Sequence, residues 1–254
     1  LTSLFICLIM GPKFITYMES KQKSGQPIRP DGPPSHILTK KGTPTMGGIL
    51  ILFSLVVSSL IWSDLGNNFV WIVLYTTITF GLLGFIDDMK KVLNASSDGI
   101  LWSLKLFFQI LISLSIIFLI INNFPETNNY SISLPFFKNP IIVYGWFFVL
   151  FSLCVLVGTS NAVNLTDGLD GLAIIPVMIT ASSMGLISYL AGNYIFSNYL
   201  YIQFIPDVGE LTVICAALFG SGLGFLWFNA PPAMIFMGDT CLLYTSDAAD
   251  ERRC

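Results

Sequence analysis

The chain has 254 residues, of which 54% are hydrophobic and 11% charged, and its formal net charge is −3. A soluble domain carries about 25% charged residues, so this composition excludes an ordinary soluble fold and a disordered chain. Twelve basic against fifteen acidic side chains exclude a nucleic-acid-binding protein. Five cysteines without a CxxC pair indicate neither a disulfide framework nor a zinc site. The sequence therefore predicts an all-α polytopic membrane protein of one domain.

Seven apolar runs have about the length that a membrane-spanning helix needs. They cover residues 1–18, 44–62, 69–86, 101–121, 141–158, 172–191 and 211–229. Because hydrophobic residues are continuous in these runs and do not alternate, the runs predict helices and exclude a β-barrel. The segment 122–140 contains Tyr130-Ser-Ile-Ser-Leu134, which predicts a small β-hairpin at the extracytoplasmic membrane surface.

Basic residues gather on one side of the predicted membrane. If the runs alternate in direction, the segments 11–46, 87–100, 159–171 and 230 onward share a side, and only Lys138 of the ten basic residues before position 241 lies opposite. The positive-inside rule assigns this side to the cytoplasm.

Asp87 and Asp88 end the third run. Two carboxylates at a helix C-terminus face its partial negative charge, so we expect a compensating cation, either from lysines or from Mg²⁺. The alternative is a solvated helix end with Lys90 and Lys91 as neighbours.

Asn164, Asp167 and Asp170 recur every third residue within Asn161–Gly171, and on a helix they would form one stripe. A helix cap needs only one such residue, so the set favours ligand binding. Asp239, within Phe236-Met-Gly-Asp-Thr240, is a weaker signal that a buried capping residue would also give.

The first basic loop holds Arg29, Lys40 and a glycine at position 42. We interpret this loop as a phosphate-binding loop; the alternative is a solvated loop that contacts anionic lipids. The only histidine, His36, is more typical of an interfacial hydrogen-bonding group than of a catalyst.

Carboxylates and lysines on one face predict Mg²⁺-dependent phosphoryl or phospho-sugar transfer, because Mg²⁺ prefers a few carboxylates together with substrate phosphates. A site at the membrane boundary suits one lipid substrate and one water-soluble substrate.

The chain resembles the phospho-N-acetylmuramoyl-pentapeptide-transferase family (MraY-type), within the superfamily of polyprenyl-phosphate N-acetylhexosamine-1-phosphate transferases. Five stretches carry the resemblance in the family's order. They are Ser35-His36, Lys40 with Gly42-Thr-Pro-Thr-Met-Gly-Gly48, Phe85-Ile-Asp-Asp88, Ser160–Gly171, and Phe225-Leu-Trp-Phe-Asn229 with Phe236–Thr240.

The resemblance implies a ten-helix fold, about seven of whose helices are present, and transfer of phospho-N-acetylmuramoyl-pentapeptide from its UDP carrier to undecaprenyl phosphate, giving lipid I and UMP. It implies Mg²⁺ at Asp239 and catalytic roles for Asp87, Asp88 and Asp239. It implies substrate binding by a larger set: Lys40, Asn164, Asp167, Asp170, Asn229, Phe236 and Gly238. Direct attack by the lipid phosphate, with Asp87 as a base, and a covalent aspartyl-phosphate both stay open, as does a homodimer.

The last fourteen residues depart from the family. Residues 1–240 are predicted to be an incomplete transferase domain and residues 241–254 a foreign tail, so the chain alone is expected to show little activity. A related transferase with a UDP-GlcNAc-like donor is the nearest alternative. A proton- or cation-coupled transporter is a distant one, because the acids cluster at one face and not at the span centres.

Overall fold

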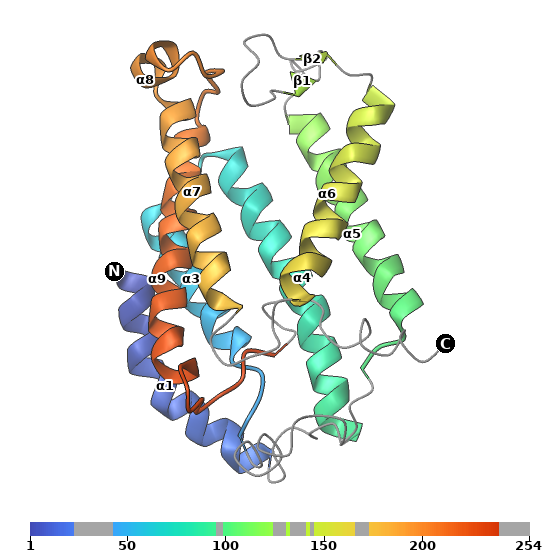
Figure 1. The fold of residues 1–254 in the computed structure, drawn as a ribbon, viewed down its shortest axis with the longest axis vertical. Coiled ribbons are helices and arrows are strands. Elements are labelled where there is room, and N and C mark those ends of the chain that lie inside the picture. Colours follow the sequence, from blue (N-terminus) through green and yellow to red (C-terminus); the bar gives the residue numbers. More distant parts are fainter. Residues whose placement is uncertain are drawn as a thin grey trace.

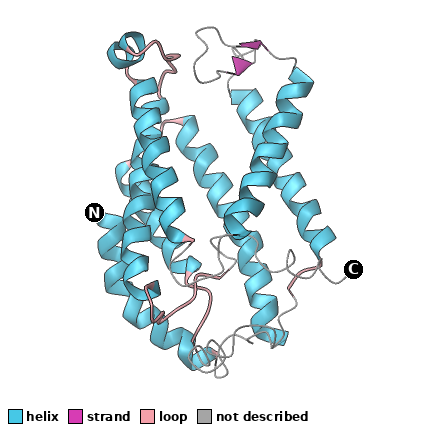
Figure 2. Ribbon diagram, in the orientation of Figure 1, coloured by secondary structure: helices cyan, strands magenta, loops and turns pink. Residues whose placement is uncertain are grey.

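The computed structural model describes residues 1–22, 43–94, 99–123, 131–132, 141–142, 145–165 and 173–238. Its helices are α1 (Thr2–Lys21), α3 (Gly48–Trp62), α4 (Asn68–Asn94), α5 (Trp102–Asn123), α6 (Gly145–Leu165), α7 (Ile174–Gly192), α8 (Tyr194–Tyr199) and α9 (Leu211–Asn229). A 3-10 turn, η2 (Val208–Glu210), precedes α9. Helices make up most of the coloured ribbon (Figure 2).

The seven predicted runs correspond to α1, α3, α4, α5, α6, α7 and α9, which confirms the all-helical membrane fold. Five helical segments are long and apolar enough to cross a membrane: Asn68–Leu93, Trp102–Asn123, Gly145–Val163, Ile174–Gly192 and Val208–Asn229. Helix α3, at 15 residues, is shorter than the roughly 20 that a perpendicular span needs.

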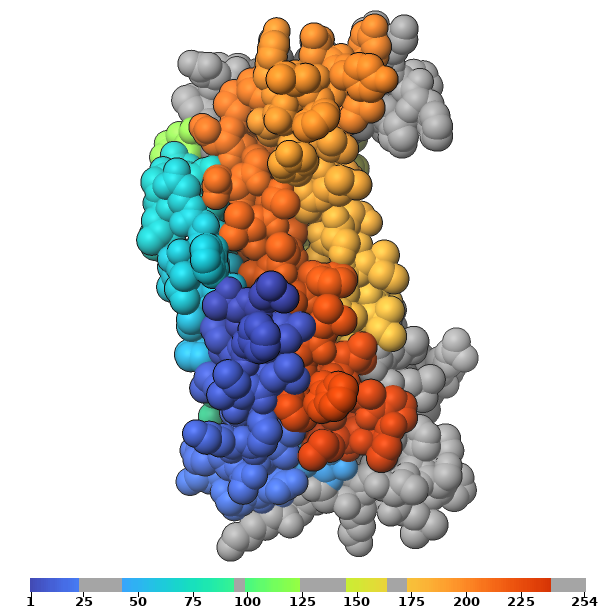
Figure 3. Space-filling view, turned by 90° about the vertical axis from the view of Figure 1, so that its left-hand side faces the viewer, coloured from blue at the N-terminus to red at the C-terminus, as the bar shows by residue number. Residues whose placement is uncertain are grey.

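The helices pack as two groups (Figure 1). Helices α1, α3, α7 and α9 form one group, in which α9 contacts each of the other three. Helices α4, α5 and α6 form the other, with α5 in contact with both α4 and α6. Figure 3 shows α1 lying directly against α9, with α7 beside it. The two groups meet where α4 contacts α3 and α9.

Glycines let the helices of the first group approach closely. A Cβ on Gly224 of α9 would lie 2.8 Å from Cys7 Cβ and 3.0 Å from the Leu4 carbonyl of α1. A Cβ on Gly222 would lie 2.7 Å from Met178 Cγ of α7. The largest buried cluster lies in this group and includes Phe225 and Ile51.

Three boundaries differ from the sequence prediction. Helix α4 continues past Asp88 to Asn94, so the two aspartates lie inside the helix and not at its C-terminus. Residues 141–142, expected in a helix, form strand β2 (Ile141–Ile142), which pairs antiparallel with β1 (Ser131–Ile132). Residues 161–165, which begin the predicted binding motif, form the last turn of α6.

Candidate functional site

The candidate site lies at one end of the bundle, which we call the site end. Here α1 and α9 end and α3 begins, in the lower part of Figure 1. Three segments converge at this end. They are residues 43–48 before and at the start of α3, residues 235–238 after α9, and the part of α4 that carries Asp87 and Asp88.

Main-chain hydrogen bonds join the first two segments. Phe236 N–H donates to the Pro44 carbonyl at 2.9 Å, while Gly47 N–H donates to the Phe236 carbonyl at 2.9 Å. Gly48 N–H donates to the Met237 carbonyl at 2.7 Å. The amides at the start of α3, which have no partner within the helix, are thereby used to hold residues 236–237 in place.

The end of α1 fixes the same segment from its other side. The buried Gln22 amide donates to the Thr45 carbonyl at 3.3 Å and accepts from Thr45 N–H at 2.9 Å. Met46 follows with φ +78° and is also buried. Residues 44–48 are therefore held in a set shape by contacts from α1 and from residues 235–237.

Gly238 brings the chain against Asp88. A Cβ on Gly238 would lie 2.7 Å from Asp88 Oδ2 and 3.1 Å from Thr45 Oγ1, and the residue has φ +73°. Both facts require glycine, because other residues rarely adopt this backbone conformation and a side chain would meet the carboxylate. The predicted site residues Asp88 and Gly238 are thus brought together.

Two other predicted residues, Asn229 and Phe236, lie beside this contact. The buried Asn229 amide donates to the Ile235 carbonyl at 2.8 Å, so it shapes the turn that leads to Phe236. The Phe236 side chain is half-buried. In this structure the Asn229 side chain therefore holds the main chain of the turn before Phe236.

Asp87 lies in a cluster of its own between α4 and α5. Its Oδ2 is 2.8 Å from Lys91 Nζ and 3.5 Å from Lys105 Nζ, and its Oδ1 accepts from Ile100 N–H at 2.7 Å. Gly99 approaches so closely that a Cβ there would meet both carboxylate oxygens. The cation expected beside the aspartates is therefore supplied, at Asp87, by two lysines.

Lys105 is a site residue that the sequence prediction missed. It was counted with the basic residues of the positive side, yet it is buried and joins α5 to Asp87 of α4. One turn further along α5, the buried Gln109 donates to Ser160 Oγ of α6 at 3.4 Å. The available signal was a lysine four positions into an apolar run, where an unpaired charge is costly.

Several predicted residues lie outside the described ranges. These are Lys40, Asp167, Asp170 and Asp239, together with the side chain of Asn164, whose main chain belongs to the last turn of α6. Among the residues that the structure describes, no group of three or more His, Cys, Asp or Glu side chains could hold a metal ion. Asp88, beside Gly238, offers one carboxylate of the kind that Mg²⁺ prefers, and Asp239 lies outside the described residues.

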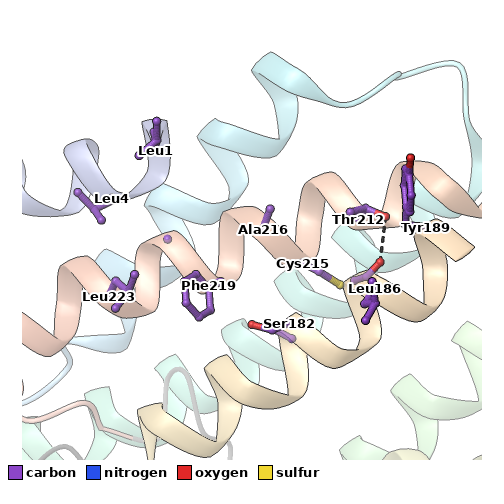
Figure 4. A pocket seen from close by; sticks show the side chains of 13 residues that line it. Leu1, Leu4, Ser182, Leu186, Tyr189, Thr212, Cys215, Ala216, Phe219 and Leu223 are labelled. Atoms are coloured by element: carbon purple, nitrogen blue, oxygen red, sulfur yellow. Dashed lines mark hydrogen bonds between the residues drawn. The ribbon is translucent and has the colours of Figure 1, made fainter.

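A separate apolar cavity of about 520 Å³ lies between α1, α7 and α9 (Figure 4). Its walls include Leu4, Tyr189 and Phe219, and the Thr212 hydroxyl on its edge donates to the Gly185 carbonyl at 3.1 Å. None of the predicted site residues lines it.

Sequence comparison identifies the family of the chain. The chain belongs to glycosyl transferase family 4, which matches residues 70–244 and so includes Asp87, Asp88 and Gly238. Within this class, signature 1 of the phospho-N-acetylmuramoyl-pentapeptide-transferases matches residues 40–52. This segment includes residues 44–48, which are hydrogen-bonded to Gln22 and to residues 236–237. The predicted family resemblance is confirmed.

Two curated relatives bear the name phospho-N-acetylmuramoyl-pentapeptide-transferase. The protein of Phenylobacterium zucineum is 50% identical over 244 residues, which cover 94% of this chain and 66% of the relative. The protein of Rickettsia felis is 52% identical over 238 residues, which cover 94% of this chain and 65% of the relative. The chain thus spans about two thirds of the length of these relatives. It is a multi-pass membrane protein homologous to these bacterial transferases.

Proposed function

We propose that the protein transfers phospho-N-acetylmuramoyl-pentapeptide from its UDP carrier to undecaprenyl phosphate, giving lipid I and UMP. The observation that carries this proposal is the matched signature segment, residues 40–52, whose main chain is hydrogen-bonded to residues 236–237 next to the Asp88–Gly238 contact. The distribution of basic residues favours the cytoplasmic face of a bacterial inner membrane for the site. A homodimer in the bilayer is part of the proposal and can be checked by native mass spectrometry.

The Asp87 cluster suits the phosphate of the lipid acceptor. Lys91 and Lys105 bring two positive charges to one carboxylate, which leaves a net positive charge in a buried setting. A phosphate is attracted to such a place, and one bound by these lysines would lie within reach of the Asp87 carboxylate, which could accept its proton. Asp87 would then be the base that prepares the acceptor.

The Asp88–Gly238 contact suits the nucleotide donor. Asp88 and Asp239 would hold Mg²⁺, which, when bound, neutralises the negative charge that develops on the UMP leaving group. Phe236 and Gly238 would lie beside the uracil. The remaining proposed donor contacts come from Lys40, Asn164, Asp167, Asp170 and Asn229.

The proposed step is a direct displacement. An oxygen of undecaprenyl phosphate attacks the phosphorus linked to the sugar, the bond from that phosphorus to the oxygen of UMP breaks, and UMP leaves with the electron pair. Asp87 holds the proton removed from the acceptor. Catalysis in such reactions rests mostly on positioning and charge neutralisation, which the buried lysines and carboxylates can supply.

The test measures donor binding and transfer separately. The purified chain in detergent is titrated with UDP-N-acetylmuramoyl-pentapeptide and with UDP-GlcNAc, and labelled donor is then incubated with undecaprenyl phosphate and Mg²⁺. We expect selective binding of the muramoyl donor, lost in Asp88→Asn and kept in Asp64→Asn, a matched change at an exposed loop. Preference for UDP-GlcNAc would favour the related hexosamine-1-phosphate transferases, and binding of neither donor would contradict the proposal.

A covalent route through Asp87 or Asp88 is the alternative mechanism. The two routes differ in one intermediate, an aspartyl-phosphate that carries the sugar in the absence of the lipid acceptor. We expect no label on the protein after denaturation of such a mixture. A trapped phospho-enzyme would exclude direct displacement.

A further inference from the structure

The end of the bundle opposite the site end carries an uncharged aromatic segment. Residues 193–206, which we call the aromatic loop, include no Asp, Glu, Lys or Arg. The loop contains α8 and presents nine exposed large hydrophobic side chains: Tyr194, Ile195, Phe196, Tyr199, Leu200, Tyr201, Ile202, Phe204 and Ile205. An exposed apolar patch of this kind marks an interaction surface, because leaving it in water is unfavourable.

The aromatic loop is folded and well hydrogen-bonded. The Asn193 side chain accepts from the amides of Ile195 and Phe196 at the start of α8, and Ile202 N–H donates to the Ser197 carbonyl at 2.9 Å. Ile205 N–H returns to the Ala191 carbonyl of α7 at 3.0 Å. Most of the loop's main-chain N–H groups therefore have partners within the protein, which lowers the cost of moving them out of water.

The acidic residues that follow the loop contact the turn between α3 and α4. Directly after the loop, the Asp207 carbonyl accepts from Asn67 at 2.7 Å, and Glu210 accepts from the Asp64 amide at 3.2 Å. Both contacts join η2 and its flanks to the turn between α3 and α4. Tyr194 and Phe204 instead pack edge to face, with ring centroids 5.6 Å apart.

The position of the loop matches the edge of a bilayer. Helix α7 has 19 residues, about 28 Å of helix, close to the roughly 30 Å of a hydrocarbon core. Helix α8 starts two residues after α7 ends, and it lies beyond α7 at the end of the bundle that also holds β1 and β2 (Figure 1). Tyrosine rings with an apolar body and a polar hydroxyl are enriched at this depth of membranes.

We propose that the aromatic loop is a membrane-surface anchor that inserts between the phospholipid headgroups and the upper acyl chains, at the bilayer surface opposite the site end. The anchor fixes how deeply α7 lies in the bilayer. At its other end, α7 begins at Ile174, shortly after the Asn161–Gly171 motif. The bilayer is the occupant that the exposed side chains fit, since the loop continues directly from a membrane-spanning helix and carries no charge.

The test places an environment-sensitive fluorescent amino acid, Anap, at single positions by amber suppression. The variants are Tyr199→Anap and Ile195→Anap, whose side chains are exposed, and the matched control is Asp64→Anap on the turn between α3 and α4. The full chain is reconstituted into vesicles of phosphatidylethanolamine and phosphatidylglycerol, with or without lipids that carry a nitroxide on the upper acyl chain.

We expect a blue-shifted emission and a loss of fluorescence with nitroxide lipid at positions 195 and 199, and emission typical of water without quenching at position 64. Emission typical of water at both loop positions would overturn the anchor. A blue shift without quenching, together with energy transfer between labelled copies, would assign the patch to self-association and would also overturn it. The readout is independent of transferase activity, so failure of the proposed function leaves it intact.

Discussion

Glycines bring α1, α7 and α9 into close contact, whereas a buried ion pair joins α4 to α5. In the first group, Gly224 lies against α1 and Gly222 against α7. In the second, Lys105 pairs with Asp87 and Gln109 with Ser160. Tyr75 and Ser115 share a further hydrogen bond at 3.1 Å between α4 and α5.

The difference follows from the solvent. Lipid is as apolar as leucine, so burial of apolar surface gives helices in a membrane little reason to associate. Close packing at glycines and hydrogen bonds or ion pairs between polar side chains are the two remaining means. The first is clearest between α1, α7 and α9, and the buried ion pair is found between α4 and α5. The side chains that join α4 to α5, Asp87 and Lys105, are also those proposed above for the acceptor.

The largest expected effect comes from breaking the polar group at its buried ion pair. Lys105→Met removes one of the two ammonium groups beside Asp87 and leaves a buried charge less compensated, which should lower the free energy of unfolding by about 3 kcal/mol. Reversible unfolding in SDS measures this value. Lys90→Met, at an exposed position of α4, is the matched control.

A double variant sharpens the interpretation of that result. Asp87→Asn together with Lys105→Met removes both charges, so it should cost less than the sum of the two single changes. If Lys105→Met behaves as Lys90→Met does, or if the costs simply add, the ion pair does not hold α4 to α5.

The next effect tests the glycine-packed group. Gly224→Ala places a methyl group against Cys7 Cβ and the Leu4 carbonyl, and such overpacking should cost about 2 kcal/mol. Gly158→Ala in α6 is the control, because its added Cβ meets no described atom within 4 Å. We expect Gly158→Ala to stabilise by up to about 1 kcal/mol through helix propensity, and equal effects of the two changes would contradict the contrast between the groups.

The contact between the segment after α9 and Asp88 of α4 is tested by Gly238→Ala. The substitution strains a residue at φ +73° and directs a methyl group at Asp88, so the Kd for the UDP-linked donor should rise about tenfold, or about 1.4 kcal/mol. Gly209→Ala adds a Cβ whose only contact is 3.9 Å away and should leave the Kd unchanged. Unaltered binding in Gly238→Ala would separate this contact from donor recognition.

The smallest effect is expected at Gln109. Its amide makes one long hydrogen bond, and its Oε1 has no hydrogen-bond partner among the described residues, so Gln109→Leu should change the free energy of unfolding by less than about 1 kcal/mol. Gln22→Leu is the comparison, because it leaves the buried Thr45 amide unpaired and should cost about 1–3 kcal/mol. A large loss in Gln109→Leu would reveal a stronger polar contact than the structure describes.

Hydrophobic runs were sufficient to predict the number and order of the main helices, because a membrane-spanning helix must be continuously apolar. They were insufficient at the site end. Met89 to Leu93 look polar enough for a loop, yet they are mostly good helix formers, and α4 continues through them.

The pairings within the site were beyond sequence reasoning for a related reason. Lys105 and Asp87 lie on different helices, and Gln22 and Thr45 lie on different segments. The contact within each pair therefore depends on how the helices align after folding. Asp88 and Gly238 were both predicted as site residues from motifs, but their contact is a result of the fold.

The hydrogen bond from Gly47 to Phe236 has a consequence for synthesis. Gly47 leaves the ribosome roughly 190 residues before its partner, which at about 5–20 residues per second is a wait of roughly 10–40 s. During that interval the first helices can insert into the membrane, but residues 44–48 lack their main-chain hydrogen-bond partners, residues 236 and 237. The contacts of the site end therefore form only after α9 has emerged, and a nascent chain released before residue 238 has helices in the membrane but lacks the contact of Gly238 with Asp88.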